Sequence, residues 1–482
     1  MHSPGSASRP RMFPGDNQCG LAAITEPKAG PGGGCTAAST AVVQLSTINA
    51  SPGFCFIKNA EFKQCVVLLQ PASNQRVSKQ DSEPKFTMPP IPQDLIKVIV
   101  SCLEDRESLE ASSLVSSAFC EPSQRILLSS LTLADHHHPG PPTYVAASTL
   151  LEESPHIASY ITRLCIELPG PTATPGALQA LQQILGKLEN VDSCIVAGET
   201  RLKWKNIDGT LILSLHNFIS RVSLQQLHVL RIDKIPLAVF VKLLEAAPLL
   251  AFSCTTVSAK EADLSAVPAP QSRVPERLIL EMGAHGICDL LARPELAGFT
   301  AGLKDLKVMP HYARIGSAGL AGSAASTLTH LRLDFTGLVM RTIAMPPLPA
   351  LTSLDVSVLF GGNSESWFRQ SLSPMLSSTA SHALAVVTIS FFPIVTQLYS
   401  VLNLHPGLTS MLDSLLMAHP GNPRITWRPS FFSERDSAVH FNRFVGMVQT
   451  RMPNMHGNGR CFVEEYKYQY GVGKGSPLPY AV

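Results

Sequence analysis

Two short segments hold residue types that can bind ligands. Three consecutive histidines, His136–His138, offer ring nitrogens suited to a metal, and GVGKGS at 471–476 imitates a phosphate-binding loop. The histidines lie in a proline-rich stretch typical of a solvated loop. The lysine of GVGKGS is followed by Gly, where a phosphate-binding loop has Ser or Thr. We therefore expect neither a metal site nor a cofactor.

The residue types of covalent catalysis are present, but their spacing predicts no active site. No GxSxG motif marks a nucleophilic serine. The acidic pairs 152–153 and 464–465 are adjacent in sequence, so their side chains need not converge on one substrate. We expect no enzymatic activity. An enzyme on an α/β fold stays open as an alternative that would need a polar pocket with shifted pKa values.

Cysteine usage indicates a reducing compartment. The eleven cysteines are odd in number, no two are spaced as CxxC, and most of those in the body of the chain lie in apolar stretches. This usage is typical of reduced, buried thiols and predicts neither disulfides nor a zinc site. Residues 1–20 contain no apolar segment of a secretion signal. We expect a cytoplasmic or nuclear protein.

One uncharged stretch, 370–412, is apolar enough to be tested as a membrane span. Pro393 splits it, and several hydroxyl side chains interrupt it. The pattern instead predicts a buried strand at 385–391 and a helix that starts near Pro393. We therefore expect no membrane segment.

Composition predicts a large folded core preceded by a low-order segment. The 482 residues are 45% hydrophobic and 15% charged, and the net charge of +2 creates no global field for nucleic acid or an anionic membrane. Residues 1–87 are rich in Pro and Gly and have no sustained period, which predicts a disordered or low-order segment. Residues 134–159 open with ADHHHPGPPT and predict a linker.

The region 160–432 repeats one strand-like pattern. The form LxxLxL, or its β-branched equivalent, starts at 161, 227, 303, 328 and 351, with weaker copies at 274–280 and 384–389 and space for another near 191–196. Helical patterns at 174–188 and 236–247 lie between the strands. Such alternation predicts an α/β fold of the leucine-rich-repeat-like solenoid class. The alternative is an ordinary α/β domain with leucine-rich strands.

The two ends of this region differ from it. Residues 433–482 predict one amphipathic helix at 440–452 and a flexible tail. Residues 88–133 predict a small helical domain whose first helix, after Pro92, is apolar over far more than one face. A unit of about 45 residues cannot bury so much apolar surface by itself. Part of that surface must meet a partner or the neighbouring domain.

Segment 88–133 resembles an F-box, of the divergent F-box-like type abundant in fungi, whose members often carry irregular leucine-rich repeats. The matching features are IPQDLI at 91–96, the aliphatic spacing Ile99–Leu103, and LxxSSLVSxxF at 109–119. The family usually has an aromatic residue, often Trp, at the position of Phe119 and a basic residue at Ser117. The resemblance assigns partner binding to Pro92, Leu95, Ile96, Ile99, Leu103, Leu109, Leu114, Val115 and Phe119.

The resemblance implies a substrate-recognition adaptor of a cullin-RING (SCF-type) ubiquitin ligase. The F-box would dock on the linker subunit of the ligase, and the repeats would bind a protein substrate of unknown identity. The alternative is a leucine-rich protein-interaction scaffold that does not bind the ligase. We expect neither a nucleic-acid nor a membrane partner.

One row of side chains on the predicted sheet suggests where a substrate binds. In LxxLxL the residue between the last two apolar positions points away from the core. Neighbouring like charges in this row would favour an anionic cover, and a merely solvated sheet face is the alternative. The row comprises Cys165, Arg231, Ile279, Lys307, Arg332 and Asp355, and we assign substrate binding to Arg231, Lys307, Arg332 and Asp355.

Overall fold

The computed structural model describes the greater part of the chain after residue 90. The described ranges are 91–103, 105–134, 142–271, 273–309, 314–335, 342–359, 368–377, 379–392, 406–430 and 437–465. The predictions for residues 1–87, His136–His138, the start of a helix at Pro393 and the tail from 466 lie outside these ranges.

A group of three helices begins the described chain: α2 (Gln93–Ser101), α3 (Arg106–Val115) and α4 (Ser117–Leu127). Helix α4 packs against both of the others. Asp105 caps α3, because its carboxylate accepts the backbone N–H of Ser108 at 2.7 Å. We call this group the three-helix unit.

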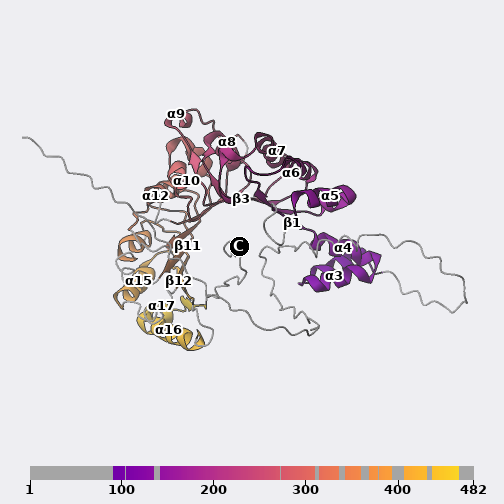
Figure 1. Cartoon of the computed structure of the whole chain (residues 1–482). Coiled ribbons are helices and arrows are strands. Elements are labelled where there is room, and N and C mark those ends of the chain that lie inside the picture. The colour runs from indigo at the N-terminus through magenta and orange to yellow at the C-terminus, as the bar shows by residue number, and fades with distance from the viewer. Residues whose placement is uncertain are drawn as a thin grey trace, which may run out of the picture. The chain divides into compact units, whose positions relative to one another are not determined.

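A parallel sheet of twelve strands follows, and its strands are hydrogen-bonded in chain order (Figure 1). The strands are β1 (Ser130–Leu133), β2 (Arg163–Leu168), β3 (Ser193–Lys203), β4 (Gln226–Asp233), β6 (Leu249–Ser253), β8 (Arg277–Leu280), β9 (Asp305–Val308), β10 (His330–Phe335), β11 (Ser353–Leu359), β12 (Val386–Phe392), β13 (Arg424–Pro429) and β14 (Cys461–Val463). A second, two-stranded sheet pairs β5 (Ile235–Pro236) with β7 (Val257–Ser258).

Helices from α5 onward lie along one face of the large sheet (Figure 1), and we call the opposite face, on which none of these described helices lies, the free face. They are α5 (Tyr144–Glu153), α6 (Pro175–Lys187), α7 (Gly209–Arg221), α8 (Leu237–Leu244), α9 (Glu261–Leu264), α10 (His285–Leu291), α11 (Ala297–Thr300), α12 (Arg314–Ser323), α14 (Ser373–Met375), α15 (Pro406–Ala418), α16 (Ser437–Arg451) and α17 (Pro453–Gly457). The shorter turns are η1 (Pro155–Ser159), η2 (Trp204–Asn206), η3 (Pro294–Leu296) and η4 (Phe368–Leu372). Thr174 caps α6, because its hydroxyl oxygen accepts the N–H of Ala177.

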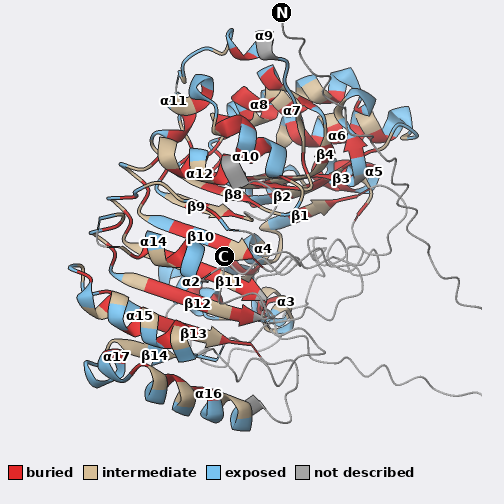
Figure 2. Cartoon of the chain, turned by 90° about the vertical axis from the view of Figure 1, so that its left-hand side faces the viewer, coloured by how far each residue is buried: buried red, intermediate tan, exposed pale blue. Residues whose placement is uncertain are grey.

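A column of buried apolar residues runs across the sheet, and Figure 2 shows buried positions along its strands. Its members hold the same register position in successive strands and are all buried: Leu131, Leu164, Cys194, Leu227, Leu250, Leu278, Leu306, Leu331, Leu354, Val387 and Ile425. The repeat length varies from 23 residues, between Leu227 and Leu250, to 38 residues, between Val387 and Ile425.

A hydrogen-bond ladder fixes this register where the strands begin. The carbonyl of Lys304 accepts the N–H groups of Thr329 and His330, both at 2.9 Å. The carbonyl of Thr329 in turn accepts those of Thr352 and Ser353, at 2.9 and 3.0 Å. The same arrangement recurs at Ser129, Thr162, Asp192, Pro248, Glu276 and Thr352.

The prediction of a mixed α/β fold is confirmed, and every segment predicted from LxxLxL forms a strand of the sheet. The sheet also extends beyond the region 160–432. Strand β1 lies in the segment 88–133 and pairs with β2, while β14 lies in the segment 433–482 and pairs with β13. Strand β6 was not predicted, because all five of its residues are buried and show no alternation.

Helix α16 packs on the last strands through aromatic side chains. Phe391 stacks on Trp427 with ring centroids 5.5 Å apart, and Phe444 of α16 meets both rings edge-on. Phe444 and Val448 are buried, as the amphipathic pattern predicts, whereas Phe441 and Val445 are half-buried.

A buried carboxylate fastens α17 to α15. Asp413 accepts the backbone N–H of Met455 at 2.8 Å, the side-chain N–H of Asn454 at 2.8 Å and its backbone N–H at 3.3 Å. These groups lie in the first turn of α17, whose N–H groups have no partner within the helix. Asp413 therefore supplies partners that the short helix cannot supply itself.

We predict that Asp413→Ala destabilises the protein by about 2 kcal/mol, because it leaves the buried N–H of Met455 and the N–H groups of Asn454 without their acceptor. Urea unfolding should show a lower midpoint. Ser414→Ala, at an exposed position of the same helix, is the control and should change the free energy of unfolding by less than about 0.5 kcal/mol. Equal midpoints for the two variants would contradict this account.

Candidate functional site: an apolar helical surface and the free face of the sheet

The three-helix unit has a small core of its own. Ile96, Val100 and Leu109 are buried in it, and Leu103, Phe119 and Leu127 pack partly buried around them. Only one stripe of α2 faces this core, since Ile96 and Val100 are its buried residues. The remaining apolar positions of α2 have no place inside the unit.

The unit consequently presents large aliphatic side chains at its surface. Leu95, Ile99, Leu114 and Val115 are between 41% and 70% exposed, and Ile91 and Val98 are exposed as well. Exposed large apolar residues on a small helical unit are candidates for contact with a partner. Leu95 and Ile99 are one turn apart on α2, whereas Leu114 and Val115 end α3. We call Leu95, Ile99, Leu114 and Val115 the aliphatic surface.

Some of the residues predicted to bind a partner are exposed, and others are buried in the core of the three-helix unit. Ile96 and Leu109 are only 2% and 6% exposed, so they hold the unit together and cannot contact a partner directly. The prediction for these two residues is corrected, because the sequence pattern does not tell which side of an all-round apolar helix is buried. Pro92 is exposed and starts α2, its carbonyl accepting the N–H groups of Leu95 and Ile96.

The second surface is the free face of the sheet, which carries the side chains that alternate with the buried column. In one row, register pairs Ile279 with Lys307, Lys307 with Arg332, and Arg332 with Asp355. These positions agree with the predicted row. The row continues through Cys165, Ile195, His228 and Ala251 in earlier strands and Thr388 and Thr426 in later ones.

Arg231 does not belong to this row. Leu227, not Leu230, occupies the buried column, so His228 holds the position that was predicted for Arg231. Arg231 has a positive φ of 57° and lies 3.4 Å from the Glu167 carboxylate through Nη2. The pattern LHVLRI can be aligned in two ways, and only the strand pairing decides between them.

Carboxylates from this row and from neighbouring rows form ion pairs with its basic side chains. Lys307 Nζ lies 3.2 Å from Glu281, and Arg332 Nε lies 3.5 Å from Asp355. Asp305, from the preceding row, contacts Arg332 as well. The like charges of the row are therefore offset within the protein and do not by themselves require an anionic cover. The prediction considered one row alone and therefore missed Glu281 and Asp305. Both lie two residues from a predicted position, Glu281 after Ile279 and Asp305 before Lys307, so the sequence could have indicated them.

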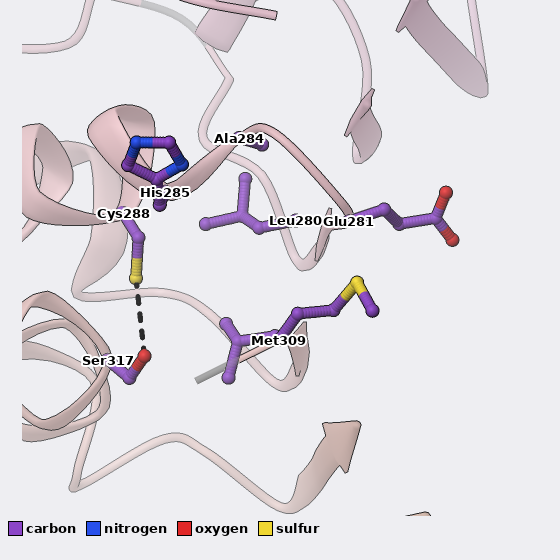
Figure 3. Close-up of a pocket in the computed structure, with 8 residues that line it drawn as sticks. Leu280, Glu281, Ala284, His285, Cys288, Met309 and Ser317 are labelled. Carbon is purple, nitrogen blue, oxygen red and sulfur yellow. Dashed lines mark hydrogen bonds between the residues drawn. The ribbon is translucent and has the colours of Figure 1, made fainter. Parts of the chain in front are cut away.

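A narrow pocket lies beside the ends of β8 and β9 (Figure 3). Leu280, Glu281, Ala284, His285, Cys288, Val308, Met309 and Ser317 line it. The Cys288 thiol points away from the His285 ring and donates to Ser317 Oγ at 3.7 Å. Burial raises the pKa of this thiol to about 12, so it is protonated at neutral pH and is not a nucleophile.

Among the residues that the structure describes, no three His, Cys, Asp or Glu side chains are grouped as a metal site requires. None of the helices within the described ranges combines the length and apolar composition of a membrane span. A scan against models of protein families finds no match to this chain, and a search of curated proteins finds no similar sequence.

We predict that Cys288 resists alkylation in the folded protein, because its thiol is buried and its pKa is raised. Treatment with iodoacetamide at pH 8, followed by mass spectrometry of the peptides, should label the exposed Cys102 and leave Cys288 unlabelled. Both residues should react after denaturation in urea. Labelling of Cys288 as fast as Cys102 in the folded chain would contradict the prediction.

Proposed function

We propose that the protein is a substrate-recognition adaptor of a cullin-RING ubiquitin ligase. The three-helix unit would dock on the linker subunit, and the free face of the sheet would bind the substrate. The observation that carries the proposal is the aliphatic surface, which leaves Leu95, Ile99, Leu114 and Val115 exposed at positions where the segment resembles an F-box. The role in ubiquitin transfer rests on that resemblance.

The energetics of the aliphatic surface support docking by burial. Covering one large aliphatic side chain contributes about 1.5–3 kcal/mol relative to leaving it in water. Four such residues on a unit with its own core could provide the apolar centre of an interface without unfolding. Among the predicted contacts, Ile96 and Leu109 would act indirectly by holding α2 and α3 in place.

The parallel sheet supports the second half of the proposal. Strands in chain order, with helices on one face, are the arrangement expected of a leucine-rich-repeat-like solenoid. Its free face carries Lys307, Arg332 and Asp355, which we retain as substrate-binding candidates, and Arg231 remains a candidate beside Glu167. The reduced cysteines fit a cytoplasmic or nuclear adaptor.

A binding experiment tests the docking half and separates it from the scaffold alternative. We expect the full-length chain to co-purify with the linker subunit. We expect the double variant Leu95→Asp/Ile99→Asp to bind at least about a hundredfold more weakly, since charges would be buried unpaired in the interface. Thermal unfolding should be unchanged, because both residues are exposed.

The matched control is Leu213→Asp, at an aliphatic position of α7 that is 65% exposed and lies outside the three-helix unit. This variant should bind the linker subunit as the unmodified chain does. Absence of binding by the unmodified chain would reject the adaptor and favour a leucine-rich scaffold. Equal loss in the control would show that the contact is not specific to the aliphatic surface.

A further inference from the structure

Two arginines meet at one carboxylate oxygen on the free face of the sheet. Arg277 of β8 donates its Nε–H to Asp305 Oδ2 at 3.2 Å, and Nη2 of Arg332 from β10 lies 3.7 Å from the same oxygen. Asp305 starts β9, which lies between the two strands. The carboxylate therefore brings two guanidinium groups from non-adjacent strands close to each other.

The carboxylate lies deeper than the guanidinium groups that it holds. The side chain of Asp305 is 16% exposed, whereas those of Arg277 and Arg332 are 44% and 45% exposed. Within the described ranges, Arg277 donates to a protein acceptor only through Nε. A guanidinium carries five N–H donors, so the other donors of Arg277 have no acceptor among the described residues.

The other charged side chains near Arg277, Asp305 and Arg332 form ion pairs of their own or contact Arg332 from its other side. Asp355 contacts Arg332 through Nε at 3.5 Å, on the side of β11, and Lys307 is held by the deeper carboxylate of Glu281. The six side chains include three cations and three carboxylates. The Arg277 and Arg332 side chains are the most exposed of the six, Asp355 follows at 35%, and Asp305 and Glu281 are the least exposed.

We propose that Arg277 and Arg332 together form a receptor for an acidic side chain of a partner protein, either a carboxylate or a phosphorylated residue. Planar guanidinium groups bind both anions through paired N–H donors. Asp305 orients the pair before binding, which reduces the entropy lost when the anion binds. The inference deepens the proposed function and rests on it for the biological role, because the receptor lies on the proposed substrate surface.

Two other arginines provide an internal comparison. Arg163 and Arg424 occupy the same row as Arg277, in β2 and β13, and both are exposed. In the part of the chain that the structure describes, neither contacts a carboxylate. They match Arg277 in charge and position on the sheet but lack the bridging acid and the second guanidinium.

The test uses the full-length chain and fluorescein-labelled peptides of eight residues: octaglutamate, a glycine-rich peptide with one phosphoserine, and octaglutamine as the neutral control. We expect at least one acidic peptide to bind and octaglutamine not to bind, measured by fluorescence anisotropy at 0.15 M salt. Arg277→Ala/Arg332→Ala should weaken the binding by about tenfold or more, since it removes the charged donors. Arg163→Ala/Arg424→Ala should change it by less than about twofold.

A second double variant distinguishes loss of the anion-binding donors from loss of the folded structure. Arg277→Lys/Arg332→Lys keeps both charges beside Asp305 but removes the paired donors, so the peptide affinity should fall while thermal unfolding is unchanged. Binding of the phosphoserine peptide alone, or of octaglutamate alone, supports the receptor and identifies the source of the anion. Failure of both acidic peptides to bind, or equal loss in the Arg163/Arg424 variant, overturns it.

The test is independent of the ligase. All variants should bind the linker subunit as the unmodified chain does, because they do not alter the three-helix unit. Peptide binding without linker binding would reject the adaptor and keep the receptor, whereas linker binding without peptide binding would reject only the receptor.

Discussion

The apolar face of each strand can be buried only by neighbouring repeats and the helices above them, and this constraint organises the whole sheet. No single repeat has enough atoms to cover its own strand. The continuous column from Leu131 to Ile425 is the result, since each member between these two ends lies between the equivalent residues of two adjacent strands. The carbonyl ladder at the strand starts keeps these side chains in line. Everything on the opposite face, including the row with Arg332, takes its position from that alignment.

The same constraint explains what could be predicted from the sequence. The strands with LxxLxL were predictable because burial on one face imposes a period of two. Strand β6 was not, since both its faces are covered. Arg231 was misplaced because LHVLRI offers two possible registers, and the register depends on hydrogen bonds to other strands. Periodicity thus predicts that a strand exists, but it does not tell which residues become neighbours.

The candidate surfaces show the same limit. The sequence indicated that α2 is too apolar to be buried in a small unit, and the exposed Leu95 and Ile99 agree with this. It did not tell that Ile96 faces the core, because that depends on where α4 packs. On the sheet, Asp305 and Arg277 were missed because their ion pair joins different strands. The burial of Ile96 and the pairing of Arg277 with Asp305 both depend on contacts between segments that are distant in sequence.

The carbonyl ladder also has an evolutionary consequence. Residues between strands can be added or lost freely as long as the next strand returns to the ladder, and the observed spacing of 23 to 38 residues illustrates this tolerance. A single-residue insertion within a strand is different, because it would turn the following side chains to the opposite face. Gene duplication of a whole strand–helix unit would preserve both faces. We therefore expect relatives of this chain to differ in helix length and repeat number while their strands keep the same alternation.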